Sequence, residues 1–296
     1  MERGMKIRII ALLAFAASRL TAQPGPSTDV WLVPMKQQGA VPTFGAPVNA
    51  THRTGYDNQP SFTANGDGVF YTVIGTDGAT DIWRIPLPPG KPRQMTATKE
   101  SEYSATVTPD GRFFSVIRVE ADSTQRLWKF PLDGGPPSLV LEQIKPVGYH
   151  VWGGAHTLVL YVLGAPAPTL RIADDRTGTG EVVATNIGRT LAKVPGRDAV
   201  TFVQLAKDST AWISELDLHS KAIRRVAPAL EGGDYHVWTP KGVLLSAAGS
   251  RVYAWIDGRW DTVADFGRWG VRGLSRLAVS PKGDWLAFVA LDKPSP

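Results

Sequence analysis

Two short segments of this 296-residue sequence place a histidine between a tyrosine and a Val-Trp pair. Residues 149–152 and 235–238 both read Tyr-His-Val-Trp, and they start 86 residues apart. Imidazole is a common metal ligand and acid–base group near neutral pH, so His150 and His236 are the first candidates for chemistry. Tyrosine rings instead favour binding, because they combine contact area with a hydrogen-bonding hydroxyl. The two segments therefore indicate either a metal-dependent site or a ligand pocket.

Other kinds of catalytic site are not encoded. The sequence has no cysteine, which excludes disulfides, zinc–thiolate sites and cysteine nucleophiles. No serine lies in a Gly-x-Ser-x-Gly elbow. The segment Gly178-Thr179-Gly180 lacks the third glycine of a dinucleotide-binding loop, and no Gly-Lys-Ser/Thr phosphate loop is present. Lysine and arginine are scattered among acids rather than gathered in a patch, so nucleic-acid binding is not expected.

A turn that recurs at nearly regular spacing organises the rest of the sequence. Its clearest form is Thr-Pro-Asp-Gly, followed each time by an apolar run. Self-similarity with a period of about 40 to 45 residues is the signature of a repeat protein. Four clear and two degenerate copies predict six units, with turns at residues 63–66, 108–111, 153–155, 194–197, 239–242 and 280–283.

Each unit has the pattern of four strands. The Pro-Asp-Gly turn reverses the chain, so the short strand before it pairs with the apolar strand after it. That second strand, for example residues 69–73 or 285–289, is apolar on both faces and is expected to be buried. A third strand carries a tryptophan such as Trp83 or Trp128, which we expect to pack between sheets. A more polar fourth strand, as at residues 138–141, lies at the edge.

The two ends of the sequence complement each other. The last unit has only two strands, at residues 275–279 and 285–291, whereas residues 28–34 repeat the third-strand pattern without a first or second strand before them. The segment around Val41 is the candidate fourth strand. One shared blade would remove both free edges, so the sequence predicts an all-β, six-bladed β-propeller closed by pairing of its N- and C-terminal strands. The predicted propeller covers residues 23–296, with blade units at approximately 56–99, 101–143, 147–187, 188–230, 233–266, and 272–291 completed by 28–50.

The repeat resembles that of TolB-type, WD-repeat-like propellers. The likeness is clearest in Thr-Pro-Asp-Gly at residues 108–111, followed by an apolar strand and by Leu-Trp-Lys-Phe-Pro-Leu-Asp-Gly-Gly at residues 127–135. The resemblance implies a propeller fold over nearly all of residues 23–296. Its motifs specify a blade rather than a reaction. TolB itself is periplasmic and has a separate α/β domain ahead of its propeller, for which this sequence leaves no room between Gln23 and Val30, so the resemblance does not extend to the role of TolB.

The predicted blades bring polar and aromatic residues to one rim. The residues that begin each innermost strand align around the axis, and function in propellers usually lies in the loops at such a mouth. Aromatic rings with histidine, arginine and acidic side chains form a plausible pocket there. The predicted ligand- or partner-binding residues are Glu102, Tyr103, Tyr149, His150, Arg189, Asp234, Tyr235, His236 and Arg276.

Three interpretations remain open from the sequence: two functions, and an accessory ring whose only task is structural. The first is a non-catalytic binding or scaffold propeller that presents its channel mouth to a protein, a peptide or another envelope ligand. The second is a carbohydrate-active or metal-dependent enzyme, similar to a lyase, that uses His150, His236 and nearby acids. The two histidines fall on units three and five, and no third histidine occupies the equivalent position. We therefore predict no catalytic residue, no metal and no cofactor, and we predict a monomer.

The first residues have the pattern of an export signal. Arg3, Lys6 and Arg8 precede an apolar run at residues 9–17, and small residues lie before Gln23. Residues 1–22 are therefore predicted to be a secretory signal peptide, which makes the protein periplasmic or secreted. The run is about half of the roughly 20 residues that span a bilayer, so a retained anchor is the weaker interpretation. Removal of the segment would lower the net charge from +5 to about +2.

Overall fold

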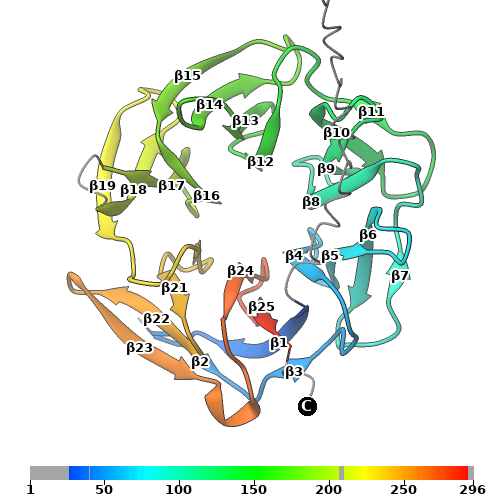
Figure 1. Cartoon of the computed structure of the whole chain (residues 1–296). Coiled ribbons are helices and arrows are strands. Elements are labelled where there is room, and N and C mark those ends of the chain that lie inside the picture. Colours follow the sequence, from blue (N-terminus) through cyan, green and yellow to red (C-terminus); the bar gives the residue numbers. More distant parts are fainter. Residues whose placement is uncertain (1–26, 40, 207–209, 293–296) are drawn as a thin grey trace, which may run out of the picture.

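Each turn of the repeat reverses the chain into an antiparallel hairpin, and six such hairpins surround one axis (Figure 1). The computed structural model describes residues 27–39, 41–206 and 210–292. In these ranges the chain forms six antiparallel sheets, each of which is one blade of a β-propeller. The only helix of the described ranges is a short 3₁₀ turn, η1 (Gly267–Trp269). None of the described helices is long and apolar enough to cross a membrane.

Blades 1 to 5 are each built from four consecutive strands, with the innermost strand first. Blade 1 has β4 (Asp57–Phe62), β5 (Gly68–Ile74), β6 (Thr80–Pro86) and β7 (Arg93–Gln94); blade 2 has β8 (Ser101–Val107), β9 (Phe113–Val119), β10 (Gln125–Pro131) and β11 (Ser138–Leu139); blade 3 has β12 (Val147–Trp152), β13 (Thr157–Val162), β14 (Thr169–Asp174) and β15 (Gly180–Thr185); blade 4 has β16 (Ile187–Lys193), β17 (Ala199–Leu205), β18 (Ala211–Asp217) and β19 (Ile223–Pro228); blade 5 has β20 (His236–Trp238), β21 (Leu244–Ala248), β22 (Arg251–Ile256) and β23 (Arg259–Asp265).

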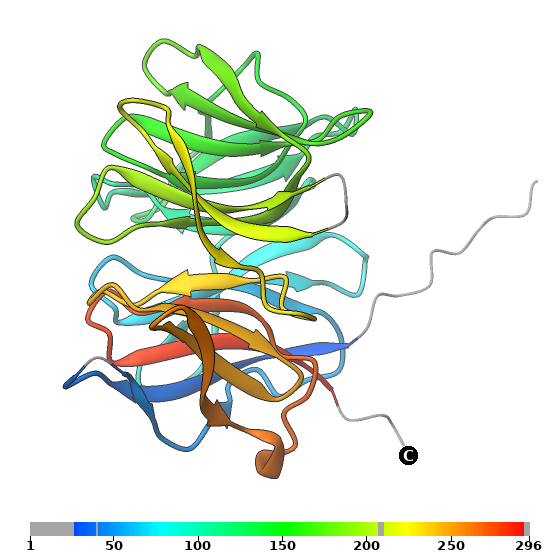
Figure 2. The ribbon, with the colours of Figure 1, turned by 90° about the vertical axis from the view of Figure 1, so that its left-hand side faces the viewer.

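Blade 6 joins the two ends of the chain, as the sequence predicts. Its inner strands are β24 (Ser275–Val279) and β25 (Trp285–Leu291), and its third strand is β1 (Thr28–Lys36). The ladder between β1 and β25 pairs Trp31 with Phe288 and Pro34 with Trp285, so both tryptophans lie in one sheet. Figure 2 shows β1 beginning and β25 ending on the same side of the ring. The fourth position is filled by two short strands, β2 (Thr43–Phe44) and β3 (Val48–Asn49), rather than by Val41 itself.

The hydrophobic core lies between neighbouring blades. The second strand of each blade is buried on both faces, as in β5, where six of seven residues are buried. Phe70 of blade 1 stacks on Phe114 of blade 2 with ring centroids 5.3 Å apart. Phe114 stacks in turn on Phe130 at 5.5 Å. Aromatic pairs of this kind add stability beyond the area they bury, so the stack of Phe70 on Phe114 helps to hold blade 1 against blade 2.

The six-bladed, all-β fold and its closure by the two chain ends are therefore confirmed. The predicted signal peptide, residues 1–22, lies outside the described residues.

Candidate functional site

A cavity of about 650 Å³ follows the central axis along the innermost strands. It is lined by residues from all six blades, including the four residues of each Tyr-His-Val-Trp segment. At one end it reaches Arg189, Tyr235 and Arg276 at the start of innermost strands, and at the other end it reaches Pro240 and Pro281 in the repeat turns. The blades thus enclose a channel whose two mouths differ in chemistry.

The first of these mouths gathers most of the tyrosines of the protein. Two further cavities, of about 640 and 360 Å³, adjoin the channel there, and Arg189 lines all three. Five of the seven tyrosines line these cavities. We call this surface the tyrosine–arginine mouth, and it consists of Tyr56, Tyr103, Tyr149, Tyr161, Tyr235, Arg189 and Arg276.

Bulges in the innermost strands aim side chains at this mouth. In blades 1, 2 and 6 the register between first and second strands shifts at the same place, and the shifted residues Gln59, Ser104 and Arg276 have φ of 56°, 55° and 53°. A left-handed φ is uncommon for residues other than glycine. Bulges re-aim side chains and often lie beside functional sites. The strained backbone of the bulge therefore directs Arg276 toward the axis.

Arg276 reaches across the channel to the opposite blade. Its Nη2 donates a 3.0 Å hydrogen bond to the hydroxyl of Tyr149 in blade 3, whereas Arg276 itself belongs to blade 6. The guanidinium carbon lies 5.1 Å from the ring centroid of Tyr149 and 4.6 Å from that of Tyr235. Both distances are within the range of cation–π attraction. Two aromatic faces from two blades thus hold one cation at the mouth.

The charge of this arginine has no acidic counterpart in the part of the chain that the structure describes. Neither Arg276 nor Arg189 forms an ion pair with any described aspartate or glutamate. Tyr56 and Tyr235 do not supply negative charge either, because burial disfavours their ionised forms. Burial raises the pKa of Tyr56 to about 12 and also raises the pKa of Tyr235. The channel and the cavity of about 360 Å³ are therefore cationic where Arg189 and Arg276 line them, whereas two acids, Glu231 and Asp234, line the cavity of about 640 Å³.

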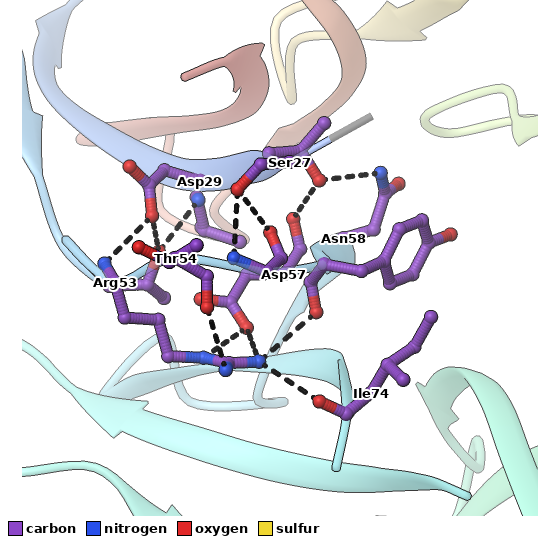
Figure 3. Close-up of polar contacts among 12 residues, drawn as sticks. Ser27, Asp29, Arg53, Thr54, Asp57, Asn58 and Ile74 are labelled. Atoms are coloured by element: carbon purple, nitrogen blue, oxygen red, sulfur yellow. Dashed lines mark hydrogen bonds and ion pairs between the residues drawn. The ribbon is translucent and has the colours of Figure 1, made fainter. Parts of the chain in front are cut away.

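The backbone of Tyr56 takes part in the contacts that close the ring. Figure 3 shows the polar network around Ser27, Arg53 and Asp57 at this place. Tyr56 forms an isolated bridge with Thr28 at the start of β1. The guanidinium of Arg53 donates hydrogen bonds to the backbone oxygens of Tyr56 and Ile74, at 3.3 and 3.4 Å, and pairs with the buried Asp57 at 2.7 Å. The hydroxyl of Ser27 donates to the backbone oxygen of Gly55 at 3.0 Å. The polar contacts that close the ring and those that hold the backbone of Tyr56 at the mouth thus belong to one network.

The two histidines serve as contacts between blades. His150 Nε2 lies 2.7 Å from the hydroxyl of Ser115 in blade 2, and the indole N–H of Trp152 donates to the same hydroxyl at 2.9 Å. The Ser115 hydroxyl can donate its one hydrogen to the backbone oxygen of Thr106 at 3.1 Å. Its remaining lone pair then accepts from His150, which assigns the imidazole proton to Nε2.

Blade 5 repeats this arrangement against blade 4. His236 Nε2 lies 2.9 Å from the hydroxyl of Thr201, and Trp238 Nε1–H donates to the same hydroxyl at 2.9 Å. Both histidines are buried, and burial lowers the pKa of His150 to about 3 and that of His236 to about 4. They are neutral at physiological pH. In the described ranges no group of three or more His, Asp or Glu side chains is arranged to hold a metal ion.

Glu102, which the sequence predicts to be a site residue, lines none of the three cavities. It is fully buried, its carboxylate accepts a 2.6 Å hydrogen bond from Thr98, and it lies 3.3 Å from Arg118 Nε. Successive side chains of a strand point to opposite faces, so Glu102 and its neighbour Tyr103 cannot face the same cavity. Arg118 also pairs with Glu100 at 2.5 Å. Burial raises the pKa of Glu102 to about 7.

The structure therefore brings together most of the predicted site residues. Seven of them line the channel or the cavity of about 360 Å³ beside it, Asp234 lines the other adjoining cavity, and Glu102 lines none of the three. Sequence reasoning missed Tyr56 and Tyr161. Tyr161 lies on a core strand and looks like a packing residue, and its ring meets that of Tyr149 edge-on at 5.7 Å. Tyr56 lies directly before the innermost strand of blade 1, which begins at Asp57, and the predicted rim included only residues at the starts of these strands. Its place next to the rim is the signal in the sequence that could have identified it.

The sequence matches no family model and no curated protein. Solved structures are similar in fold. The TolB structure from Agrobacterium tumefaciens has a TM-score of 0.68 at 14% identity, covering 90% of this chain and 99% of that one. TolB from Acinetobacter baumannii has a TM-score of 0.56 at 11% identity, covering 90% of this chain and 64% of that one.

An enzyme shares the same architecture. A gluconolactonase from Xanthomonas campestris has a TM-score of 0.61 at 11% identity, covering 92% of this chain and 99% of that one. Identities this low establish the fold and leave the chemistry to the site. With its six blades, its closure by the two chain ends and these structural relatives, the chain has the fold of the TolB-type six-bladed β-propellers.

Proposed function

We propose that this chain is an exported, non-catalytic binding protein that presents its tyrosine–arginine mouth to a protein or peptide partner in the cell envelope. The convergence of five of the seven tyrosines on one mouth carries the proposal. Tyrosine and arginine are enriched at protein interfaces, and tyrosine gives a large contact area at a low cost in conformational entropy. The adjoining cavities of about 650, 640 and 360 Å³ offer room for several ligand side chains.

The absence of catalysis in this proposal rests on how the candidate catalytic groups are used. His150 and His236 use their Nε2 atoms for contacts between blades, and burial keeps both rings neutral. Glu102 is buried beside Arg118 and away from the three cavities. A general acid or base must reach the substrate proton. Both histidines line the channel, but their Nε2 atoms contact hydroxyls of the preceding blade and their Nδ1 atoms are buried, so neither ring nitrogen is presented to a substrate.

A pull-down experiment tests the proposal. The chain from Gln23 onward is immobilised and exposed to envelope extract of the organism that encodes it, and retained proteins are identified by mass spectrometry. We expect a specific partner that is lost when Tyr149 and Tyr235 are both changed to alanine. Tyr253→Ala is the matched control, because Tyr253 lies on β22 and lines none of the three cavities.

The outcomes separate clearly when each variant is first shown to melt near the wild-type temperature. Equal recovery of the partner by the wild type and by the double tyrosine variant would contradict the proposal. An oligogalacturonate lyase solved with manganese is also similar in fold, with a TM-score of 0.51 at 12% identity. Turnover of oligogalacturonate or of gluconolactone by the purified chain, with or without added manganese, would therefore favour the enzyme alternative instead.

Export and oligomeric state have direct measurements of their own. We propose that residues 1–22 direct secretion and are removed, so the N-terminal sequence of protein recovered from the periplasm or the medium should begin at Gln23. A retained Met1 would contradict cleavage. Sedimentation of the recovered protein should give the mass of one chain.

A further inference from the structure

Among the residues of the mouth, Arg276 has the geometry that most strongly indicates a ligand-binding role. It lies in a strand bulge with a left-handed φ of 53°, and it crosses the axis to donate a hydrogen bond to Tyr149 in the opposite blade. Strained backbone of this kind persists only where the surrounding structure enforces it, and it gathers at ligand clamps. Arg276 and Tyr149 line both the channel and the cavity of about 360 Å³ outside it. They therefore stand where the two spaces meet.

The cation is only partly compensated by the protein. The Arg276 side chain is half-buried, and within the described ranges no carboxylate lies in ion-pair distance of it. A guanidinium has five N–H donors, and the single protein acceptor that the described residues give Arg276 is the Tyr149 hydroxyl. Removing a charge from water costs free energy unless the charge is paired. The other N–H groups are thus free to receive an anion.

The surroundings of Arg276 reinforce the preference for negative charge. Arg189 is exposed, lines the same cavities and has no ion pair with a described acid. The rings of Tyr149 and Tyr235 flank the guanidinium at 5.1 and 4.6 Å. Contact with two rings limits the positions of the guanidinium, and a guanidinium matches a carboxylate with two parallel hydrogen bonds.

We propose that the tyrosine–arginine mouth recognises a carboxylate carried by a peptide, which docks on the Arg276 guanidinium between Tyr149 and Tyr235. This inference rests on the proposed binding function and specifies its ligand chemistry. The carboxylate can be a peptide C-terminus or an aspartate or glutamate side chain, because both present the same two oxygens.

The channel wall below Arg276 favours a peptide over a chain of sugar acids. It includes the apolar side chains of Val151, Leu191, Val237 and Leu277. Buried hydroxyl groups are costly without hydrogen-bond partners, and a uronate chain would bring several of them against this wall. Apolar peptide side chains next to the carboxylate would instead gain from burial there.

The test uses defined pools of synthetic heptapeptides and the chain from Gln23 onward. The first pool has free C-terminal carboxylates and no internal acids, the second has internal Asp or Glu and amidated ends, and the third is neutral at both places. We expect at least one acidic pool to be retained tenfold or more over the neutral pool. The acidic pool that is retained identifies the source of the carboxylate, and retention should fall as salt is raised.

Variants of single arginines complete the test. Arg276→Gln should reduce retention of the acidic pool at least tenfold with little change in the melting temperature, because removal of a half-buried charge that has no ion pair offsets the loss of its contacts with Tyr149 and Tyr235. Arg276→Lys should recover only part of the retention, since lysine cannot form the two parallel bonds. Arg268→Gln is the matched control, because Arg268 also packs on an aromatic ring, that of Trp269 at 3.7 Å, but lines none of the cavities.

Each contrary result has a distinct meaning. Equal retention of acidic and neutral pools would overturn the carboxylate inference and leave the proposed peptide-binding function standing. Retention of no pool would count against both. Trigalacturonate, a short chain of sugar acids, is tested alongside the peptide pools. If the chain retains trigalacturonate but no peptide pool, and Arg276→Gln loses this retention, the ligand is a sugar acid and not a peptide. A clear drop in melting temperature in Arg276→Gln would assign this residue a structural role and overturn the inference.

Discussion

The Nε2 atom of His150 lies 2.7 Å from the hydroxyl oxygen of Ser115, which belongs to the core strand of the preceding blade. The same contact recurs between His236 and Thr201 two blades further on. In both places a tryptophan N–H donates to the same hydroxyl. A single hydroxyl thus satisfies two buried ring nitrogens of its neighbour, which makes it a fastener between blades.

Removal of one of these hydroxyls should be costly. Thr201→Val keeps the side-chain volume but leaves the N–H groups of His236 and Trp238 without an acceptor, so we expect a loss of about 1–3 kcal/mol in the free energy of unfolding. Urea unfolding followed by tryptophan fluorescence measures the change. Thr262→Val, on the outer strand β23, is the control and should change stability by less than about 0.5 kcal/mol. An equal effect of the two variants would refute the fastener role.

Acid should destabilise the protein through these histidines. Burial lowers the pKa of His150 to about 3 and that of His236 to about 4, from an ordinary value of 6.5. In the unfolded chain both bind protons below pH 6.5, whereas in the folded chain they stay neutral. Each histidine therefore favours folding above pH 6.5 and loses that contribution as the pH falls, by on the order of 2 kcal/mol at pH 5.

The measurement is the urea midpoint of the wild type and of His150→Gln between pH 7.5 and 5. The wild type should lose stability more steeply than the variant, even if the variant is less stable throughout. Parallel pH profiles would show that His150 is protonated in the folded protein and would contradict its assignment as a neutral contact.

Glu102 should act with the opposite sign. Burial raises the pKa of its carboxyl to about 7 from 4.5, so the folded protein binds this proton more tightly than the unfolded chain does. Its contribution to stability is largest at low pH and declines as the pH rises from about 4.5 to 7. Glu102→Gln should therefore flatten this decline, as measured by thermal melting across the same range.

The partner of Glu102 provides the contrast. Arg118→Met leaves the buried Glu102 without its cation, and it also removes the guanidinium that lies 4.9 Å from the ring of Trp128. We expect this variant to lower the melting temperature at pH 8, whereas Glu102→Gln should not, because Arg118 retains Glu100 as a partner. Similar losses in both variants would mean that Glu102 is ionised and needed at neutral pH.

Closure of the ring should carry a measurable share of its stability. Leu32 on β1 is fully buried between blades and pairs with Ala287 across the closure ladder, so Leu32→Ala should cost about 2–5 kcal/mol. Leu291 ends the same ladder but is 38% exposed, and Leu291→Ala should cost much less. Chemical denaturation with an unchanged slope would indicate that all blades unfold together. A second transition in Leu32→Ala would show that the shared blade opens on its own.

The repeat, the number of blades and the ring closure could be predicted from the sequence, because they depend on local patterns. A Thr-Pro-Asp-Gly turn reverses the chain wherever it lies, and an apolar run such as residues 285–291 needs cover on both faces in any context. Alternation within a strand is equally local. Since residues 102 and 103 are neighbours on one strand, alternation by itself is enough to separate Glu102 from the mouth that Tyr103 lines.

Contacts across the ring could not be predicted from local sequence patterns. Arg276 and Tyr149 are 127 residues apart, and only the closed circle of six blades brings them to opposite sides of one channel. Likewise, His150 and His236 can form contacts between blades only because the preceding blade places a hydroxyl group within hydrogen-bond distance of each. The sequence by itself determined the strands and their order, since turn chemistry and hydrophobic pattern act over a few residues. The tertiary structure alone decided which side chains meet, because bulges and ring curvature set the direction in which each one points.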